Sequence, residues 1–484
     1  MKKVVIDPIT RLEGHGKISI FLNESGEVEN AYFQVPELRG FERFCIGRKA
    51  EDMPLLTTRI CGVCPVAHHF AGTKALDAAF NVEPPSAAKK LRELMYVGYY
   101  IYDHTLHFYY LGGPDFVVGP DAPPEKRNVI GVIEKAGLEI GKEVIKHRAY
   151  GQRITELIGG KATHPVCGLP GGISKPLSEE NRQEIEKMAE SSVEFARFTL
   201  KLFHDIVLGN SKYVDLIKSD AYTLKTYYMG LVDKNNRVNF YDGKVRVVDP
   251  NGNEFVKFTP KDYLDNVAEH VEEWTYVKFP YLKKVGWKGF VDGVNSGAYR
   301  VGPLGRLNAS DGMATPLAQE EYEFMYKTLG GKPVHSTLAF HWARLIELLY
   351  AAERTVELSK DPEVTSTSVR NPPGEPGEGV GIVEACRGTL IHHYVLDKEA
   401  LIKDVNLIVA TINNYPAICM SVRDAAKGLI HGGNVNEGLL NMVEMAFRAY
   451  DPCFGCASHF AVGQMPLIIE IYNHEKKILK TVQR

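Results

Sequence analysis

Two stretches decide how this chain folds: Arg59-Ile60-Cys61-Gly62-Val63-Cys64-Pro65 and Asp451-Pro452-Cys453-Phe454-Gly455-Cys456. In each Cys-x-x-Cys pair, a two-residue spacer with one glycine lets both sulfurs point at the same ion. Pro65 suits the first turn of a helix, because its missing N–H would be unpaired there. Cys64 would then lie at a helix N-terminus, whose partial positive charge favours the thiolate that metal binding requires.

The four sulfurs predict a metal site without selecting the metal. Soft sulfur donors suit zinc, iron–sulfur clusters or a nickel-type centre. A structural zinc site is the plainer alternative, but zinc ribbons place their pairs about 15–20 residues apart. Redox cysteines of the thioredoxin type are a second alternative, although no βαβ unit is evident around either pair. A metal shared by both pairs would join the two ends of the chain through the core.

Composition narrows the class of protein. The 484 residues are 44% hydrophobic and carry a net charge of −3, which indicates neither a nucleic-acid footprint nor an electrostatic membrane anchor. Asp7 comes too early for a signal peptide, and the longest apolar runs fall far short of the roughly 18 residues of a membrane span. We therefore expect a cytoplasmic protein whose cysteines serve metal or redox chemistry rather than disulfides. The remaining cysteines are expected to be buried small hydrophobes: Cys45, Cys167, Cys386 and Cys419.

Periodicity predicts one large, mainly helical body with small peripheral sheets, an α+β fold. The stretch 86–111 predicts a long, central, buried helix with Ser86 as its N-cap. Further helices are expected at about 126–158, 178–209, 316–328, 337–360 and 435–450. A hairpin is expected over 3–36, a strand-rich insert near 237–258, and strands from the loop 371–379 to about 411.

Taken together, these motifs resemble those of the large subunits of nickel–iron hydrogenases. The hallmarks are the two cysteine segments, followed by His68 and His459 respectively. The supporting segments are Arg11-Leu12-Glu13-Gly14-His15, Arg39-Gly40-Phe41-Glu42, Asp103-His104 and Glu384-Ala385-Cys386-Arg387-Gly388. The likeness runs over essentially the whole chain and implies the fold of that family, a single body around a long-helix bundle. The soluble, NAD-reducing branch looks most similar, on residues 65–69, 121–124, 127–129, 271–274, 279–283 and 463–467.

The resemblance implies a nickel ion bound by Cys61, Cys64, Cys453 and Cys456. Cys64 and Cys456 would also bridge to an iron that carries carbon monoxide and cyanide. Thr411 lies where the family hydrogen-bonds a cyanide, although a threonine in a strand is ordinary.

Arg387 is expected over the exposed side of the metals. Four thiolates on one divalent ion leave excess negative charge, which a permanently charged guanidinium can offset. Asp103 and Asp451 match the carboxylates that hold this arginine. A purely structural ion pair is the alternative for Arg387, and a helix-ending residue before Pro452 is the alternative for Asp451.

Proton transfer is expected to begin at the Cys453 sulfur and to continue through Glu13, the family's relay carboxylate. A partly desolvated glutamate has a raised pKa, which suits a relay near neutral pH. The alternative for Glu13 is a surface glutamate in an ion pair. His68 lies one helical turn after Cys64 and could donate a hydrogen bond to that sulfur.

Two further features follow from the resemblance. Glu42, His459 and the backbone carbonyl of Leu407 match a hard-cation site, usually magnesium. Relatives usually have proline just before the arginine, where this chain has Cys386. We expect a silent substitution; the alternatives are altered loop stiffness or a fifth thiol near the metals.

The implied activity is the reversible oxidation of dihydrogen, with electrons leaving through an iron–sulfur small subunit. In the soluble branch, flavin- and iron–sulfur-containing diaphorase subunits pass them to NAD. No Gly-x-Gly-x-x-Gly fingerprint is found, so NAD is expected on those partners. Alternatives are an NADP-linked, deazaflavin-linked or electron-bifurcating hydrogenase, a metal-free scaffold like the large subunit of respiratory complex I, and a zinc-stapled structural protein.

Maturation is also implied. Nickel-insertion factors and a dedicated endopeptidase are expected partners, with residues 1–459 forming the mature domain and 460–484 an extension that is removed. The alternative is an ordinary terminal strand near Leu467–Tyr472.

Overall fold

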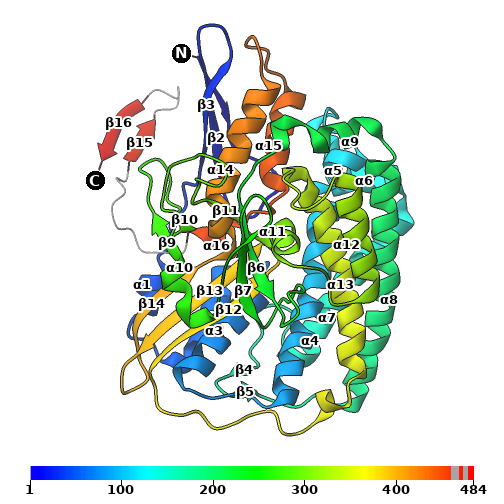
Figure 1. Ribbon diagram of the computed structural model, residues 1–484, viewed down its shortest axis with the longest axis vertical. Helices are drawn as coiled ribbons and strands as arrows, with labels where there is room; N and C mark the ends of the chain where they lie inside the picture. Colours follow the sequence, from blue (N-terminus) through cyan, green and yellow to red (C-terminus); the bar gives the residue numbers. More distant parts are fainter. Residues whose placement is uncertain (1, 459–467, 473–477, 484) are drawn as a thin grey trace.

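The computed structural model describes residues 2–458, 468–472 and 478–483. Most of the long helices gather on one side of the body, the sheets and the helices packed on them form the other, and both ends of the chain pass through the sheet-rich side (Figure 1). The mainly helical α+β fold predicted from the sequence is confirmed. Within the described residues, no helix is both long and apolar enough to cross a membrane.

Long helices form the helical side. Buried α4 (Ser86–Leu106) packs against α7 (Leu138–Gly159) and α13 (Phe340–Lys360), and α13 packs against α8 (Glu179–Phe203) and α12 (Pro316–Leu329). A π-helical turn at His107–Gly112 continues α4 to the predicted end of the stretch. α15 (Glu437–Arg448) also lies where a helix was predicted. The long-helix bundle expected from the sequence is therefore present.

Two helix boundaries differ from the sequence prediction. The N-cap of α4 is Pro85, not Ser86; Ser86 is the first helical residue, and its hydroxyl donates to Glu363 at 2.5 Å. The stretch 126–158 forms two helices, α6 (Val129–Ala136) and α7, because Gly137 between them has φ +101°. That backbone conformation suits glycine and breaks the helix.

Small sheets form the other side, and they are antiparallel except where β11 pairs with β6 in parallel. The N-terminal sheet has the order β1-β2-β3, from β1 (Lys2–Ile6), β2 (Lys17–Leu22) and β3 (Val28–Gln34), so the predicted hairpin is confirmed and gains a strand. The predicted insert contributes β7 (Lys244–Val248) and β8 (Glu254–Phe258) to a sheet of order β11-β6-β7-β8. Its other strands are β6 (Tyr227–Val232) and β11 (Tyr299–Arg300).

The sheet that carries the functional residues follows the Pro/Gly loop, as predicted. Its strands are β12 (Glu378–Ala385), β13 (Gly388–Leu396) and β14 (Ile402–Ile408), in that order. α3 (Pro65–Ala79) packs directly on β12 and β13. Close contact needs glycine here, because a Cβ at Gly381 would lie 2.2 Å from the Ala71 carbonyl oxygen.

The central helix α14 (Ala410–Leu429) was not predicted. It is largely buried and packs against α15 and β3. Thr411 therefore lies at the start of a helix and not in a strand, which corrects the alternative interpretation of that residue.

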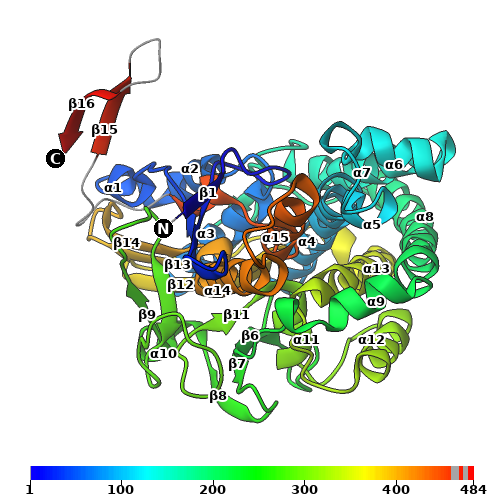
Figure 2. The ribbon, with the colours of Figure 1, turned by 90° about the horizontal axis from the view of Figure 1, so that it is seen from above.

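Shorter elements connect these units. They are α1 (Phe41–Cys45), α2 (Met53–Leu56), α5 (Pro114–Val117), α9 (Ser211–Lys218), α10 (Tyr263–Asn266), α11 (Gly302–Ala309), α16 (Phe454–Ala457), β4 (Gly168–Leu169), β5 (Gly172–Ile173), β9 (Val267–His270) and β10 (Phe279–Leu282). The C-terminal strands β15 (Ile468–Tyr472) and β16 (Ile478–Gln483) form a hairpin that stands apart from the body in both views (Figures 1 and 2).

Candidate metal centre

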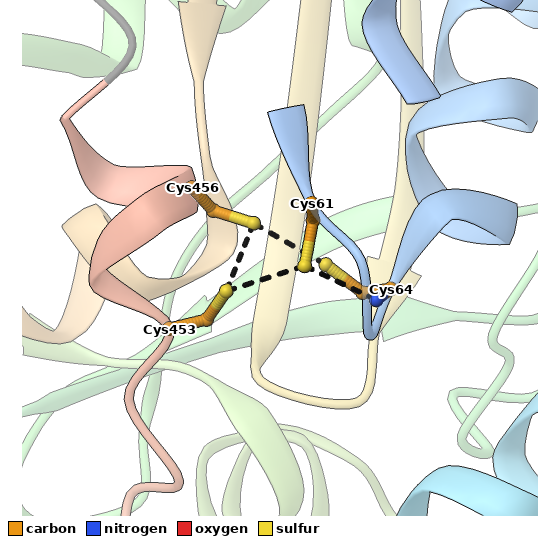
Figure 3. A group of neighbouring side chains, drawn as sticks. All are labelled: Cys61, Cys64, Cys453 and Cys456. Carbon is orange, nitrogen blue, oxygen red and sulfur yellow. Dashed lines mark hydrogen bonds between the residues drawn. The ribbon is translucent and has the colours of Figure 1, made fainter. Parts of the chain in front are cut away.

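The four cysteines of the two pairs meet in the core. Cys61 and Cys64 come from the loop that leads into α3, and Cys453 and Cys456 come from the start of α16 (Figure 3). The Sγ atoms of Cys61 and Cys453 lie 3.3 Å apart, those of Cys64 and Cys456 3.4 Å, and those of Cys453 and Cys456 3.0 Å. All four residues are at most 4% exposed. The predicted convergence of both chain ends is confirmed.

This geometry fits a single metal ion. Two sulfurs on one ion with bonds of about 2.3 Å can be at most about 4.6 Å apart; three of the sulfur–sulfur distances are 3.0–3.4 Å, and all four sulfurs form one close group. The loop can stabilise a negative charge on the Cys61 sulfur, because this sulfur accepts hydrogen bonds from the N–H groups of Val63 and Cys64, each at 3.2 Å. Cys64 is the N-cap of α3 with Pro65 at its first position, as predicted.

Burial opposes ionisation of the four thiols when no metal is bound. Burial opposes ionisation of Cys61, but hydrogen bonds from the other three thiols set its pKa well below the usual value. Burial raises the pKa of Cys453 and of Cys456 well above theirs. Burial therefore opposes ionisation of Cys453 and Cys456, and a bound cation would favour their thiolate forms.

The Arg39 side chain connects the two cysteine segments through hydrogen bonds. Its guanidinium donates to the carbonyls of Ile60 at 2.5 Å and Arg59 at 3.1 Å, just before the first pair. The same group donates to the Gly455 carbonyl at 2.9 Å, inside the second pair. One side chain thus sets the distance between loops that are far apart in sequence.

The N-terminal segment around Glu13 packs against the second cysteine pair. The Phe454 N–H donates to the Glu13 carbonyl at 3.0 Å, and Glu13 pairs with Cys453 as a short parallel bridge. Gly14 has φ +88°, and a Cβ there would lie 2.8 Å from the Gly455 nitrogen. Glycine is required at this position for both reasons.

Glu13 points at the sulfur from which proton transfer was predicted to start. The Cys453 thiol donates to Glu13 Oε2 at 2.9 Å, and the Gly455 N–H donates to the same oxygen at 2.9 Å. Burial, followed by the charge of Cys61, raises the pKa of Glu13. A carboxyl with a raised pKa in contact with a thiol can exchange a proton with it.

Arg387 lies beside the cysteines between two carboxylates. Its guanidinium donates to both Asp103 oxygens, at 2.9 and 3.1 Å, and lies 3.0 Å from Asp451. The three residues are at most 2% exposed. Arg387 lines a small cavity together with three of the four metal-site cysteines, namely Cys64, Cys453 and Cys456.

The residue before Arg387 is held by a hydrogen bond that proline could not make. The Cys386 N–H donates to the Tyr99 hydroxyl at 3.3 Å, and burial raises the pKa of the Cys386 thiol well above its usual value. Within the described chain, Cys386 does not belong to the group of four clustered sulfurs. Cys45, Cys167 and Cys419 are likewise buried, as predicted.

Thr411 and His68 both lie at the cavity. The Thr411 hydroxyl oxygen accepts the Cys453 N–H at 3.0 Å. His68 lines the cavity, and its Nδ1 lies 3.1 Å from Nε2 of His392. His392 and Tyr394, which contact each other in turn, were missed in the sequence. The only sequence signal for them was the polar run His392-His393-Tyr394 in a largely apolar strand.

The predicted cation site is described in part. The Leu407 N–H donates to Glu42 Oε1 at 2.8 Å, so α1 and β14 do bring these two residues together. His459 lies outside the described residues.

Fold and site together define the class of protein, one with four buried cysteines arranged so that they could bind a metal ion. Comparison with known proteins is more specific. The family described as nickel-dependent hydrogenase matches residues 39–123 and 143–459, and a HoxL-like family matches residues 3–38. The chain therefore belongs to the nickel-dependent hydrogenase family, as a large subunit.

Individual relatives span the whole length. The iron-sulfur subunit of the F420-non-reducing hydrogenase of Archaeoglobus profundus is 49% identical over 485 residues, covering 100% of both chains. The beta subunit of the NAD-reducing hydrogenase HoxS of Cupriavidus necator is 39% identical and covers 99% of both. A crystal structure of an NAD+-reducing [NiFe]-hydrogenase in the H2-reduced state matches with a TM-score of 0.90 at 37% identity, over 95% of this chain and 100% of that one. The predicted family fold is thereby confirmed.

Proposed function

We propose that this chain catalyses the reversible conversion of dihydrogen into protons and electrons at a nickel–iron centre held by Cys61, Cys64, Cys453 and Cys456. The observation that carries the proposal is the convergence of these four buried sulfurs, beside a small cavity that three of them line together with Arg387. When bound, the metals supply Lewis acidity that polarises dihydrogen. Cys64 and Cys456 would be shared with an iron that carries carbon monoxide and cyanide.

The protein's own part is first to receive a proton. Cys453 and Glu13 form a donor–acceptor pair at 2.9 Å, so a proton on the sulfur can pass to the carboxylate without rearrangement. Glu13 remains partly exposed, whereas Cys453 is fully buried. The pair therefore connects the closed site to the exterior.

Its second part is to hold a fixed positive charge near the sulfurs. Arg387 cannot lose its proton under ordinary conditions, and the Asp103 and Asp451 carboxylates keep it in one orientation. Such a preorganised charge stabilises charge separation in a site that excludes water. The Thr411 hydroxyl proton is available for an acceptor such as cyanide, because its oxygen already accepts the Cys453 N–H.

A magnesium ion at Glu42, the Leu407 carbonyl and His459 is part of the proposal. The contact between Glu42 and the Leu407 N–H supports it, since a carboxylate and a carbonyl are ligands that magnesium accepts.

Electrons would leave through an iron–sulfur small subunit, because the described cysteines outside the metal centre form no second cluster. Relatives support one electron acceptor, NAD, and argue against another, F420. The 39% identical NAD-reducing relative and the solved NAD+-reducing enzyme support NAD, reached through diaphorase partners in the cytoplasm. The 49% identical relative is F420-non-reducing and supports a complex that does not use this deazaflavin. The higher identity favours the second assignment.

One experiment separates these assignments. The complex is purified through a tag on this chain, its subunits are identified by mass spectrometry, and dihydrogen-dependent reduction of NAD, NADP, F420 and benzyl viologen is measured. Reduction of viologen alone supports the F420-non-reducing assignment, and reduction of NAD supports the diaphorase route. A nickel-replete complex that reduces none of the four contradicts the proposed function.

We also propose that residues 460–484 are removed on maturation by an endopeptidase, after nickel-insertion factors have acted. Two observations support this proposal: the family match ends at residue 459, and the β15–β16 hairpin stands apart from the body (Figure 2).

A further inference from the structure

A chain of three buried polar side chains leads away from the metal cavity and has no role in the function proposed above. Nδ1 of His68 lies 3.1 Å from Nε2 of His392, and Nδ1 of His392 lies 2.7 Å from the Tyr394 hydroxyl. All three residues have an exposed fraction of 0%. Buried polar networks are costly unless each member has a defined partner, so the order of donors in this chain matters.

Only two donor orders are possible for neutral imidazoles, because each ring has one N–H and one acceptor nitrogen. In the first, Tyr394 donates to His392, His392 donates to His68, and His68 carries its proton on Nε2. In the second, every bond is reversed and His68 carries its proton on Nδ1.

The first order is the one that suits the charge of the site. His68 lines the cavity beside Cys64, Cys453 and Cys456, and Nε2 is the ring nitrogen that its bond to His392 does not use. In the second order a lone pair on Nε2 would be available to sulfurs that become thiolates when metal binds, which is electrostatically unfavourable. In the first order an N–H is available to them, and such donors strengthen and orient metal ligands.

We propose that His392 and Tyr394 are positioning residues that hold His68 in the tautomer with its proton on Nε2, as a donor to the cysteine sulfurs. This inference rests on the proposed function for its purpose, since the sulfurs need a donor once they bind metal. The tautomer of a histidine is set by the hydrogen bond that its other nitrogen makes.

The packing around these three side chains leaves room for the Tyr394 hydroxyl only because residue 72 is glycine. Gly72 lies one helical turn after His68 on α3, and a Cβ there would be 3.0 Å from that hydroxyl and 3.5 Å from Nδ1 of His392. A side chain at residue 72 would therefore push against the contact that orders the chain.

The test measures the tautomer directly. In protein labelled with nitrogen-15 at its 16 histidines, solid-state NMR distinguishes protonated from unprotonated ring nitrogens, and His68→Gln identifies the His68 signals. The expected wild-type result is a protonated Nε2. Tyr394→Phe, His392→Leu and Gly72→Ala are expected to shift His68 toward Nδ1 protonation, whereas His392→Gln should preserve Nε2 protonation because its amide can donate in place of the imidazole.

The matched control is His393→Leu on the same strand. His393 contacts Tyr263 and Glu378, each at 2.8 Å, instead of His68, so this variant should leave the His68 signals unchanged. A wild-type His68 protonated at Nδ1, or Tyr394→Phe and His392→Leu variants that keep Nε2 protonated, would overturn the positioning role. If His392→Leu does not fold, the near-isosteric Tyr394→Phe decides.

A second readout connects the chain to the metals. In the purified complex, loss of the donor leaves more electron density on the sulfurs, so Tyr394→Phe should move infrared bands of iron-bound carbon monoxide to lower wavenumber, while His393→Leu should not. Failure of the proposed function is separable: wild-type complex without nickel would contradict that function, whereas the nitrogen-15 result alone decides the tautomer.

Discussion

The Cys453 thiol donates a hydrogen bond to Glu13 Oε2 at 2.9 Å, across 440 positions of sequence. The contact is fixed from both sides, because the Gly455 N–H binds the same oxygen and the Phe454 N–H binds the Glu13 carbonyl. A proton donor and acceptor held this way need no conformational change to exchange a proton.

Glu13→Gln should therefore slow catalysis without removing the metals. We expect dihydrogen oxidation to fall by roughly 10²- to 10⁴-fold, the usual contribution of one acid–base group, while nickel content stays at the wild-type value. Glu24→Gln, at the exposed turn of the N-terminal hairpin, is the control and should be fully active. A Glu13→Gln enzyme with wild-type turnover would show that protons leave by another route.

Asp103→Ala should destabilise the fold because it leaves Arg387 partly unpaired in the core. Both Asp103 oxygens accept from this guanidinium, and breaking a buried pair on one side costs about 3–5 kcal/mol. Chemical unfolding measures this loss. Glu184→Ala, which breaks an exposed pair with Arg153, should cost at most about 1 kcal/mol; equal losses in both variants would argue against the buried pair.

Acid should destabilise the protein through histidines that are buried in the neutral form. Burial, followed by the charge of Arg344, lowers the pKa of His341 to about 3, and burial lowers that of His69 to about 4. Unfolded histidines bind a proton below about pH 6.5 while the folded ones remain neutral, so stability falls as the pH drops from about 6.5 toward 4.

The slope of the free energy of unfolding against pH identifies the histidines responsible for the loss of stability. Each such histidine contributes up to about 1.4 kcal/mol per pH unit within the window, so His341→Gln should flatten the free energy of unfolding between pH 6.5 and 5. Exposed His431, whose pKa is raised by its hydrogen bond to Glu27, is the control, and His431→Gln should not flatten it. An unchanged slope in His341→Gln would show that this histidine is protonated in the folded state.

The mass of the active chain tests the proposed maturation. Active, nickel-loaded protein should lack residues 460–484 in intact-mass spectrometry, while chain isolated from cells grown without nickel should retain them. Full-length mass in the active form would contradict removal of this segment.

Much of this site could be predicted because its chemistry leaves short sequence signals. The Cys-x-x-Cys spacing, with Pro65 following, was sufficient to place Cys64 at the start of a helix. The pairing of Arg387 with Asp103 and Asp451 required the family resemblance, because nothing local to Asp103 in the last turn of α4 indicates a partner 284 positions away.

What escaped prediction depends on tertiary packing. α14 contains Pro416 and the pair Asn413-Asn414, which disfavour a helix locally, yet the core buries it on most sides. The Asn413 and Asn414 amides bind the carbonyls of Thr389 and Arg387, so these residues serve the β12–β13 turn rather than the helix. The hydrogen-bonded series of His68, His392 and Tyr394 could not be predicted for the same reason, because β13 contacts α3 only in the folded chain.

The coordination of nickel tests the central claim most directly. X-ray absorption at the nickel edge of the purified, active complex should show four sulfur ligands, and Cys61→Ser should lose the nickel while Cys45→Ala retains it. Nickel bound mainly by nitrogen and oxygen, or zinc in its place in active wild-type protein, would contradict the assignment of Cys61, Cys64, Cys453 and Cys456 as its ligands.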